Sequence, residues 1–137
     1  MNVELILSKL ASLRRCIRRI EEKKPEDAEI LSTDLDAQDI IVLNIERAVQ
    51  QCVDISAHVL VSRGLRAPSS MSAGFSDLAS AGILDVDLAG RLSRAVGFRN
   101  IAVHEYQEMD VQILYSIISM HLDDFREFAR CVVAVVE

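Results

Sequence analysis

The segment "VLNIERAVQQCVDISAHV", residues 42–59, carries an apolar or small side chain on every turn of a predicted helix. Spacings of three and four residues, typical of a helix that buries one face, separate Val42, Ile45, Val49, Cys52, Ser56 and Val59. The helix is predicted to begin at an N-cap, Thr33 or Asp34, and to end near Arg63, before Gly64. At 1.5 Å per residue, it would be roughly 45 Å long and cross a whole domain.

Similar patterns predict further helices on both sides of this segment. The first has a seam of aliphatic residues and ends before Pro25: Val3, Ile6, Leu10, Leu13, Ile17 and Ile20. A short helix is expected in "FSDLASAG", residues 75–82, and another after a cap at Asp85 or Asp87. One continuous last helix is expected from about Asp110 to Val136, with His121 in its buried stripe. The sequence therefore predicts an all-α antiparallel bundle of about five helices, forming a single domain over residues 1–137.

The composition agrees with this fold class. Hydrophobic residues make up 50% of the 137 residues, with no Trp, 2 Pro and 5 Gly, which favours long helices over a turn-rich β fold. No apolar run reaches the roughly 18 residues of a membrane helix, and the start lacks a signal-peptide layout. The 3 cysteines are widely spaced, so we expect reduced thiols in a cytoplasmic protein with no membrane partner.

The apolar surface is wide for so small a bundle. Helices with this much hydrophobic surface leave an exposed apolar face, and such faces usually mark interfaces. A homodimer is the favoured interpretation. A compact monomer, in which the second apolar stripe is simply core, remains the alternative.

Polar side chains with distinctive chemistry gather in "FRNIAVHEYQE", residues 98–108. On a regular helix Arg99 and Tyr106 would lie about 20° apart, whereas His104 would lie about 140° from Arg99. A single helix therefore cannot direct all three side chains at one point. Either the helix ends near Val103, or the site combines residues from two chains.

These side chains suit a phosphodiesterase that works without a metal ion. His104 can deprotonate an RNA 2′-hydroxyl or protonate the leaving oxygen, because histidine titrates near neutral pH. The guanidinium of Arg99 can stabilise charge at phosphorus. Asn100 could orient the histidine or bind substrate, and Tyr106 could stack on a base, bind phosphate or carry a modification.

Structural interpretations of the same residues remain open. His104 and Tyr106 could form an ordinary polar pair, and Arg99 could pair with Glu105 or Asp110. His121 is interpreted as a buried or interfacial structural residue, and His58 as structural. Three scattered histidines without paired acids make a zinc site improbable, and no phosphate-cradling glycine motif is present, so we expect no metal and no cofactor.

The segment "RNIAVHEY", residues 99–106, resembles the R-x4-H-x-Y motif of the HepT toxins, which belong to the HEPN class of helical ribonucleases. The resemblance includes Asn100 directly after the arginine and the preceding "VGF", residues 96–98. It also extends to the chain length, the helix order and the position of the motif between the last two helices.

The resemblance implies a specific biology. HepT-like proteins are metal-independent endoribonucleases that act as homodimers, with Arg99 and His104 of both chains in one cleft. They are toxins of type VII-like HEPN/MNT toxin–antitoxin systems. Their partner is a minimal nucleotidyltransferase, the MNT antitoxin, which neutralises the toxin by transferring AMP from ATP onto the motif tyrosine, here Tyr106.

The charge distribution limits where RNA could bind. A net charge of −6 is unusual for a nucleic-acid binder, so RNA binding must depend on a local basic cleft, for which Arg91 and Arg94 are the candidates. The alternative function is a non-catalytic helical partner that holds substrate for a nucleotidyltransferase. His104 separates the two, because only the nuclease needs a proton-transfer group. A purely structural bundle is a third interpretation, in which changing His104 or Tyr106 would alter little beyond stability.

Overall fold

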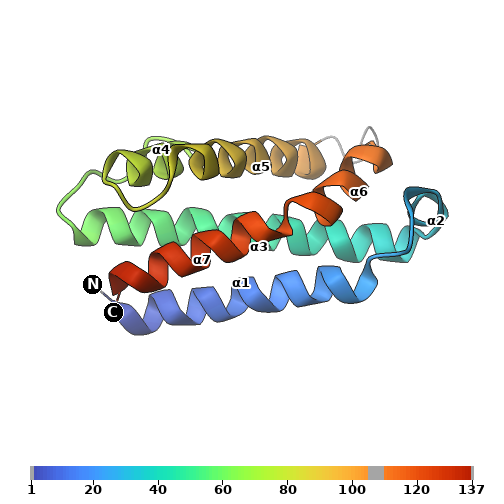
Figure 1. The fold of residues 1–137 in the computed structure, drawn as a ribbon, viewed down its shortest axis with the longest axis horizontal. Helices are drawn as coiled ribbons and strands as arrows, with labels where there is room; N and C mark the ends of the chain where they lie inside the picture. The colour runs from blue at the N-terminus through green and yellow to red at the C-terminus, as the bar shows by residue number, and fades with distance from the viewer. Residues whose placement is uncertain (1, 105–109, 137) are drawn as a thin grey trace.

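The computed structural model describes residues 2–104 and 110–136, and for residues 103 and 104 the backbone alone. Within these ranges the chain forms seven helices and no strand: α1 (Val3–Lys23), α2 (Ala28–Thr33), α3 (Leu35–Ser62), α4 (Ala73–Ser80), α5 (Val86–His104), α6 (Val111–Met120) and α7 (Leu122–Val136). Figure 1 shows α1, α3, α5 and the α6–α7 run side by side with alternating directions. The predicted all-α antiparallel bundle is confirmed.

Helix α3 lies at the centre of the bundle and contacts α1, α2, α4, α5 and α7. All six seam residues predicted for this helix are buried, each at most 3% exposed. Its N-cap is Asp34, whose Oδ1 accepts a 3.0 Å hydrogen bond from the backbone N–H of Ala37. Its C-terminal end is followed by Gly64 at φ +77°, a conformation that suits glycine. The sequence predicted both ends of this helix.

Helix α1 packs along α3 through the predicted aliphatic seam. Ile6, Leu10, Leu13 and Ile20 are fully buried, whereas Val3 at the helix start is 39% exposed. An ion pair between Lys9 Nζ and Asp54 Oδ2, 3.3 Å apart, joins the two helices beside this seam.

A short helix, α2, precedes α3 and was not predicted. Asp27 caps it by accepting a 2.8 Å hydrogen bond from the backbone N–H of Ile30. The amide of Gln38 donates to the carbonyl oxygens of Leu31 and Ser32, at 2.8 and 3.3 Å, which satisfies the end of α2. Six residues are too few to show helical periodicity, so these caps from neighbouring residues define the element.

The predicted continuous last helix is wrong, because it is interrupted at His121 between α6 and α7. The two halves pack on different neighbours: α6 contacts α2, whereas α7 contacts α1, α3 and α5. Tyr115 fastens α6 in place, since its hydroxyl donates to the carbonyl oxygens of Glu26 at 2.7 Å and Pro25 at 3.2 Å. Two helix directions are needed to make both sets of contacts.

Helix α4 sits close against α3. A Cβ added at Gly74 would lie 3.2 Å from the Ser56 Cβ and 3.3 Å from Pro68 Cγ, so the small residues allow this approach. Phe75 of α4 meets Phe128 of α7 edge to face, with ring centroids 6.0 Å apart. This aromatic pair connects α4 to α7 through the core.

The cysteines are free, as predicted. Burial raises the pKa of the Cys52 thiol well above its usual value, and burial also raises the pKa of Cys16 and Cys131. These thiols are therefore held in the neutral, apolar form. None of the helices in residues 2–104 and 110–136 is both long enough and apolar enough to cross a membrane.

Replacing Phe128, which is fully buried, tests the aromatic connection. Phe128→Ala should lower the free energy of unfolding by about 3–5 kcal/mol, because it leaves a cavity where the two rings meet. Urea unfolding followed by circular dichroism measures the change. Met120→Ala is the control: this side chain is 72% exposed, so its loss should change stability by no more than about 0.5 kcal/mol. An equal loss of unfolding free energy in the two variants would contradict the packing of Phe128 against Phe75.

Candidate functional site

Arg99 lies in the last two turns of α5, and its side chain is half-buried. Its Nη1 donates to Asn100 Oδ1 at 3.3 Å and contacts the sulfur of Met71 at 3.9 Å. Its Nε is buried and has no hydrogen-bond partner in the part of the chain that the structure describes. No carboxylate of that part forms an ion pair with it, so the alternative in which Arg99 pairs with Asp110 is not observed, and Glu105, the other candidate partner, lies outside the described residues.

This arrangement leaves the guanidinium ready for an anion. A buried N–H without a partner costs about 1–3 kcal/mol, and a hydrogen bond to an incoming oxygen anion would remove that cost. The guanidinium fork also matches the geometry of phosphate oxygens. The guanidinium of Arg99 thus has the chemistry that a phosphate-binding role requires, and that role stays a prediction.

The other motif residues are described in part. Asn100 is exposed on α5 and accepts the hydrogen bond from Arg99, so it orients the arginine. His104 is the last residue of α5, and its side chain lies outside the described residues, as do Glu105 and Tyr106 entirely. The structure describes α5 as far as His104, where the described residues stop, so the predicted helix end near Val103 stays a prediction.

Helix α5 continues without interruption through positions 99 and 104. Five residues of regular helix place these two positions about 140° apart around the helix axis. Within the described residues, α5 therefore carries the two positions on different faces. The interpretation in which two chains combine their residues stays a prediction.

Arg91 is paired within the chain. Its Nε donates to Asp124 Oδ1 at 2.9 Å, and this hydrogen bond raises the pKa of Arg91. The other carboxylate oxygen, Oδ2, lies 3.2 Å from His121 Nδ1, and the Asp124 side chain is only 14% exposed. Asp124 thus joins α5 to the α6–α7 junction and neutralises much of the charge that Arg91 could offer to RNA.

Of the two interpretations of His121, the buried one is wrong, and the interfacial one stays a prediction. Its side chain is 46% exposed and stands where α6 ends, beside Asp124. The stripe is maintained on either side by Ile118 and Phe125, which are each 2% exposed. The interruption of the helix turns position 121 away from the core.

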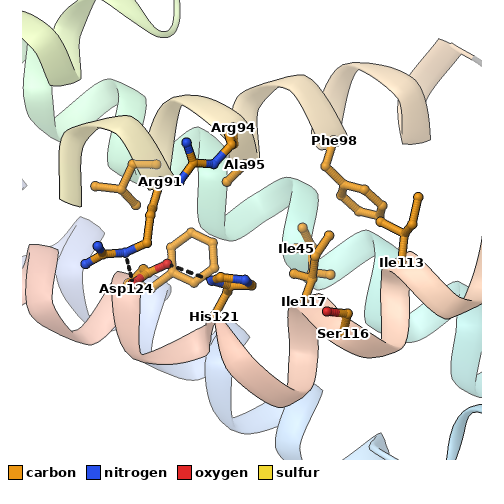
Figure 2. Close-up of a pocket in the computed structure, with 12 residues that line it drawn as sticks. Ile45, Arg91, Arg94, Ala95, Phe98, Ile113, Ser116, Ile117, His121 and Asp124 are labelled. Atoms are coloured by element: carbon orange, nitrogen blue, oxygen red, sulfur yellow. Dashed lines mark hydrogen bonds and ion pairs between the residues drawn. The ribbon is translucent and has the colours of Figure 1, made fainter. Parts of the chain in front are cut away.

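A cavity of about 330 Å³ lies between α5 and the α6–α7 run, with Ile45 of α3 among its lining residues. Figure 2 shows Arg91, Asp124 and His121 together at one end, and Phe98 and Ile113 at the other. Arg94 lines the cavity from an exposed position and forms no ion pair with any carboxylate in residues 2–104 and 110–136. Arg94 therefore remains available to an anionic ligand, unlike Arg91.

Sequence reasoning missed two residues of this region. Met71 belongs to a loop 28 positions before Arg99, and no local pattern connects them. Asp124 is three residues after His121, a spacing that brings side chains together on a helix, and this signal could have identified the pair.

The chain is similar in sequence to a known ribonuclease group. A family model described as ribonuclease HepT-like matches residues 13–132. The mRNA nuclease HepT of Shewanella oneidensis is 34% identical over 125 residues, which cover 91% of this chain and 93% of that protein.

Several solved structures are also similar to this chain. A tri-AMPylated HEPN toxin of Shewanella oneidensis, in complex with its MNT antitoxin, has a TM-score of 0.89 at 34% identity, with 98% of both chains covered. A toxin–antitoxin structure with AMP-PNP has a TM-score of 0.90 at 34% identity, covering 96% of this chain and 98% of that one. YutE of Bacillus subtilis, at 14% identity, shares the fold with a TM-score of 0.86 over 100% of this chain and 92% of its own. From the extent of the family match and the identity to HepT over nearly its whole length, the chain belongs to the ribonuclease HepT-like family.

Proposed function

We propose that this protein is the toxin of a HEPN/MNT toxin–antitoxin pair and that it cleaves RNA without a metal ion. The observation that carries the proposal is Arg99: a half-buried guanidinium with an unpartnered Nε and no carboxylate partner among the described residues. It stands at the start of the R-x4-H-x-Y spacing in a chain of the ribonuclease HepT-like family.

The proposed cleavage uses the RNA's own 2′-hydroxyl. His104 takes the hydroxyl proton, and O2′ attacks the neighbouring phosphorus. The bond from phosphorus to O5′ breaks, a 2′,3′-cyclic phosphate remains, and a protonated His104 returns a proton to the leaving O5′. Arg99 donates to the non-bridging oxygens and stabilises the extra negative charge as it develops. Asn100 supports Arg99, and Arg94 binds the strand further along α5, whereas Arg91 is already paired with Asp124.

The proposed active unit is a homodimer. Because positions 99 and 104 lie about 140° apart on α5, one chain cannot present both groups to a single phosphate. Two chains facing each other can supply Arg99 from one α5 and His104 from the other. An exposed apolar side chain within the motif supports this contact, since Ile101 is 47% exposed on α5.

The proposed regulator is an MNT-type nucleotidyltransferase that modifies Tyr106. The similar Shewanella oneidensis toxin is tri-AMPylated in its complex with an MNT antitoxin, which supports the same chemistry here. The phenol oxygen of Tyr106 would attack the α-phosphorus of ATP, forming a phosphodiester and releasing pyrophosphate. An anionic adduct two residues from His104 would repel the RNA phosphate and occupy the cleft.

Digestion of RNA in EDTA tests the nuclease. The wild-type protein should cleave, Arg99→Ala should lower the rate by about 10²–10³-fold, and His104→Ala by about 10²–10⁴-fold. Arg14→Ala is a matched control, because Arg14 is exposed on α1, away from the motif. Gel analysis of fragments carrying 2′,3′-cyclic phosphates gives the rates, and size-exclusion chromatography checks that each variant keeps its oligomeric state.

A wild-type protein that cleaves neither tRNA nor mRNA would contradict the proposed nuclease. That result would favour the alternative, a non-catalytic partner of a nucleotidyltransferase. Equal rates for the wild-type protein and His104→Ala would instead remove His104 from the mechanism.

The modification site can be tested separately, because the chain has only two tyrosines, Tyr106 and Tyr115. Incubation with the cognate nucleotidyltransferase and ATP labelled at the α-phosphate should label the wild-type protein and Tyr115→Phe equally. Tyr106→Phe should take up no label, since it lacks the attacking oxygen. Label on Tyr106→Phe at the wild-type level, measured by autoradiography, would place the modification elsewhere.

A further inference from the structure

We propose that the cavity between α5 and the α6–α7 run holds one unstacked nucleobase of the RNA, beside the scissile phosphate, and so decides which sequences are cut. This inference rests on the proposed ribonuclease function and adds a specificity site to it. Of the motif residues whose side chains the structure describes, neither Arg99 nor Asn100 lines the cavity.

The walls of the cavity suit an aromatic ring. At about 330 Å³ it falls within the range of small-ligand sites. Phe98 on α5 faces Ile113 and Ile117 on α6 (Figure 2), and Phe125 of α7 also lines the cavity with apolar surface. Proteins that recognise single-stranded RNA stack unpaired bases on aromatic side chains, a role that Phe98 and Phe125 can fill here.

The far end of the cavity can distinguish one base from another. Asp124 holds the guanidinium of Arg91 at 2.9 Å and the imidazole of His121 at 3.2 Å. The contact of His121 Nδ1 with Asp124 fixes the orientation of the imidazole ring. The other ring nitrogen, Nε2, has no hydrogen-bond partner among the described residues. A fixed set of donors and acceptors at one end of an apolar slot discriminates between base edges, because a mismatched edge leaves buried polar groups unpaired.

The cavity lies next to the proposed cleavage site along the chain. Phe98, at its near end, directly precedes Arg99, and Arg91, at its far end, lies eight residues earlier on the same helix, about 12 Å along the axis. A strand with its phosphate at Arg99 would therefore place a neighbouring base over the cavity. Arg94, exposed at its rim, can contact the phosphate attached to that base.

The charge of the rim favours RNA over a second copy of this chain. Among the residues that the structure describes, Arg91 and Arg94 line the cavity with one carboxylate, Asp124, although the whole chain has a net charge of −6. A phosphate-bearing ligand complements this local positive surplus. A second copy placed symmetrically on the cavity would present the same positive rim and be repelled.

Filling the cavity tests the proposal. Ser116 lines it from an exposed position on α6, so Ser116→Phe places a ring inside without disturbing the core. Ser119→Phe is the matched control, the same change on the same helix at an exposed position that does not line this cavity. Sequencing the fragments of a randomised RNA pool measures cleavage at every flanking sequence, and thermal melting confirms that both variants fold.

Wild type and Ser119→Phe should show a preference of about 10-fold or more for one base at a fixed position beside the cut, within the range of pocket discrimination. Ser116→Phe should still cleave but without this preference. His121→Ala should change which base is preferred, while the apolar walls still accept a base. Wild-type cleavage that ignores the flanking bases, or a preference that survives in Ser116→Phe, would overturn the proposal.

Two further results distinguish a failure of the base-binding proposal from a failure of the proposed ribonuclease function. Dissociation of a wild-type dimer by Ser116→Phe alone, seen by light scattering, would mean that a second copy occupies the cavity, which overturns it. If the wild-type protein cleaves no RNA, the proposed function fails. Titration with 5′-nucleoside monophosphates then tests whether the cavity binds a base. Shifts of the Ile113 and Ile117 methyl NMR signals in the wild-type protein but not in Ser116→Phe would support base binding. No shift in the wild-type protein would overturn the proposal.

Discussion

The burial of α3 is the constraint on which the rest of the bundle depends. The residues of its seam are buried in the bundle. The neighbouring apolar residues of the same helix are also fully buried: Ile41, Ala48, Ile55 and Leu60. A helix that is apolar on more than one side is stable in water only when neighbours cover all of those sides. Helices α1, α4, α5 and α7 supply this cover, which fixes their positions around α3.

Helix α5 serves both the core and the candidate site. Leu88, Leu92 and Val96 hold it against the bundle, each no more than 5% exposed. Arg91 and Arg94 project from the same helix into the cavity, and Arg99 stands near its end. Side chains on a packed helix are held more precisely than side chains on a loop, which suits groups that must meet a phosphate.

The sequence was informative about the candidate site wherever its residues lie close together in the chain. The spacing of Arg99, His104 and Tyr106 identified the motif, and the comparisons confirmed the family. The roles of those three residues stay predictions. The contact of Arg99 with Met71 and the pairing of Arg91 with Asp124 join positions 28 and 33 residues apart, and no local pattern contains such contacts.

The sequence by itself determined the long helices, because periodicity, N-caps such as Asp34 and terminal glycines such as Gly64 act within a few residues of one another. Only the tertiary structure decided that α2 forms, that the last helix is interrupted at His121 and that Arg91 is paired. Each depends on partners supplied by other elements: Gln38 for α2, the α2–α6 contact for the interruption, and Asp124 for Arg91. Local periodicity specifies a helix, whereas the packing of distant segments decides where it ends and which of its charges remain unpaired.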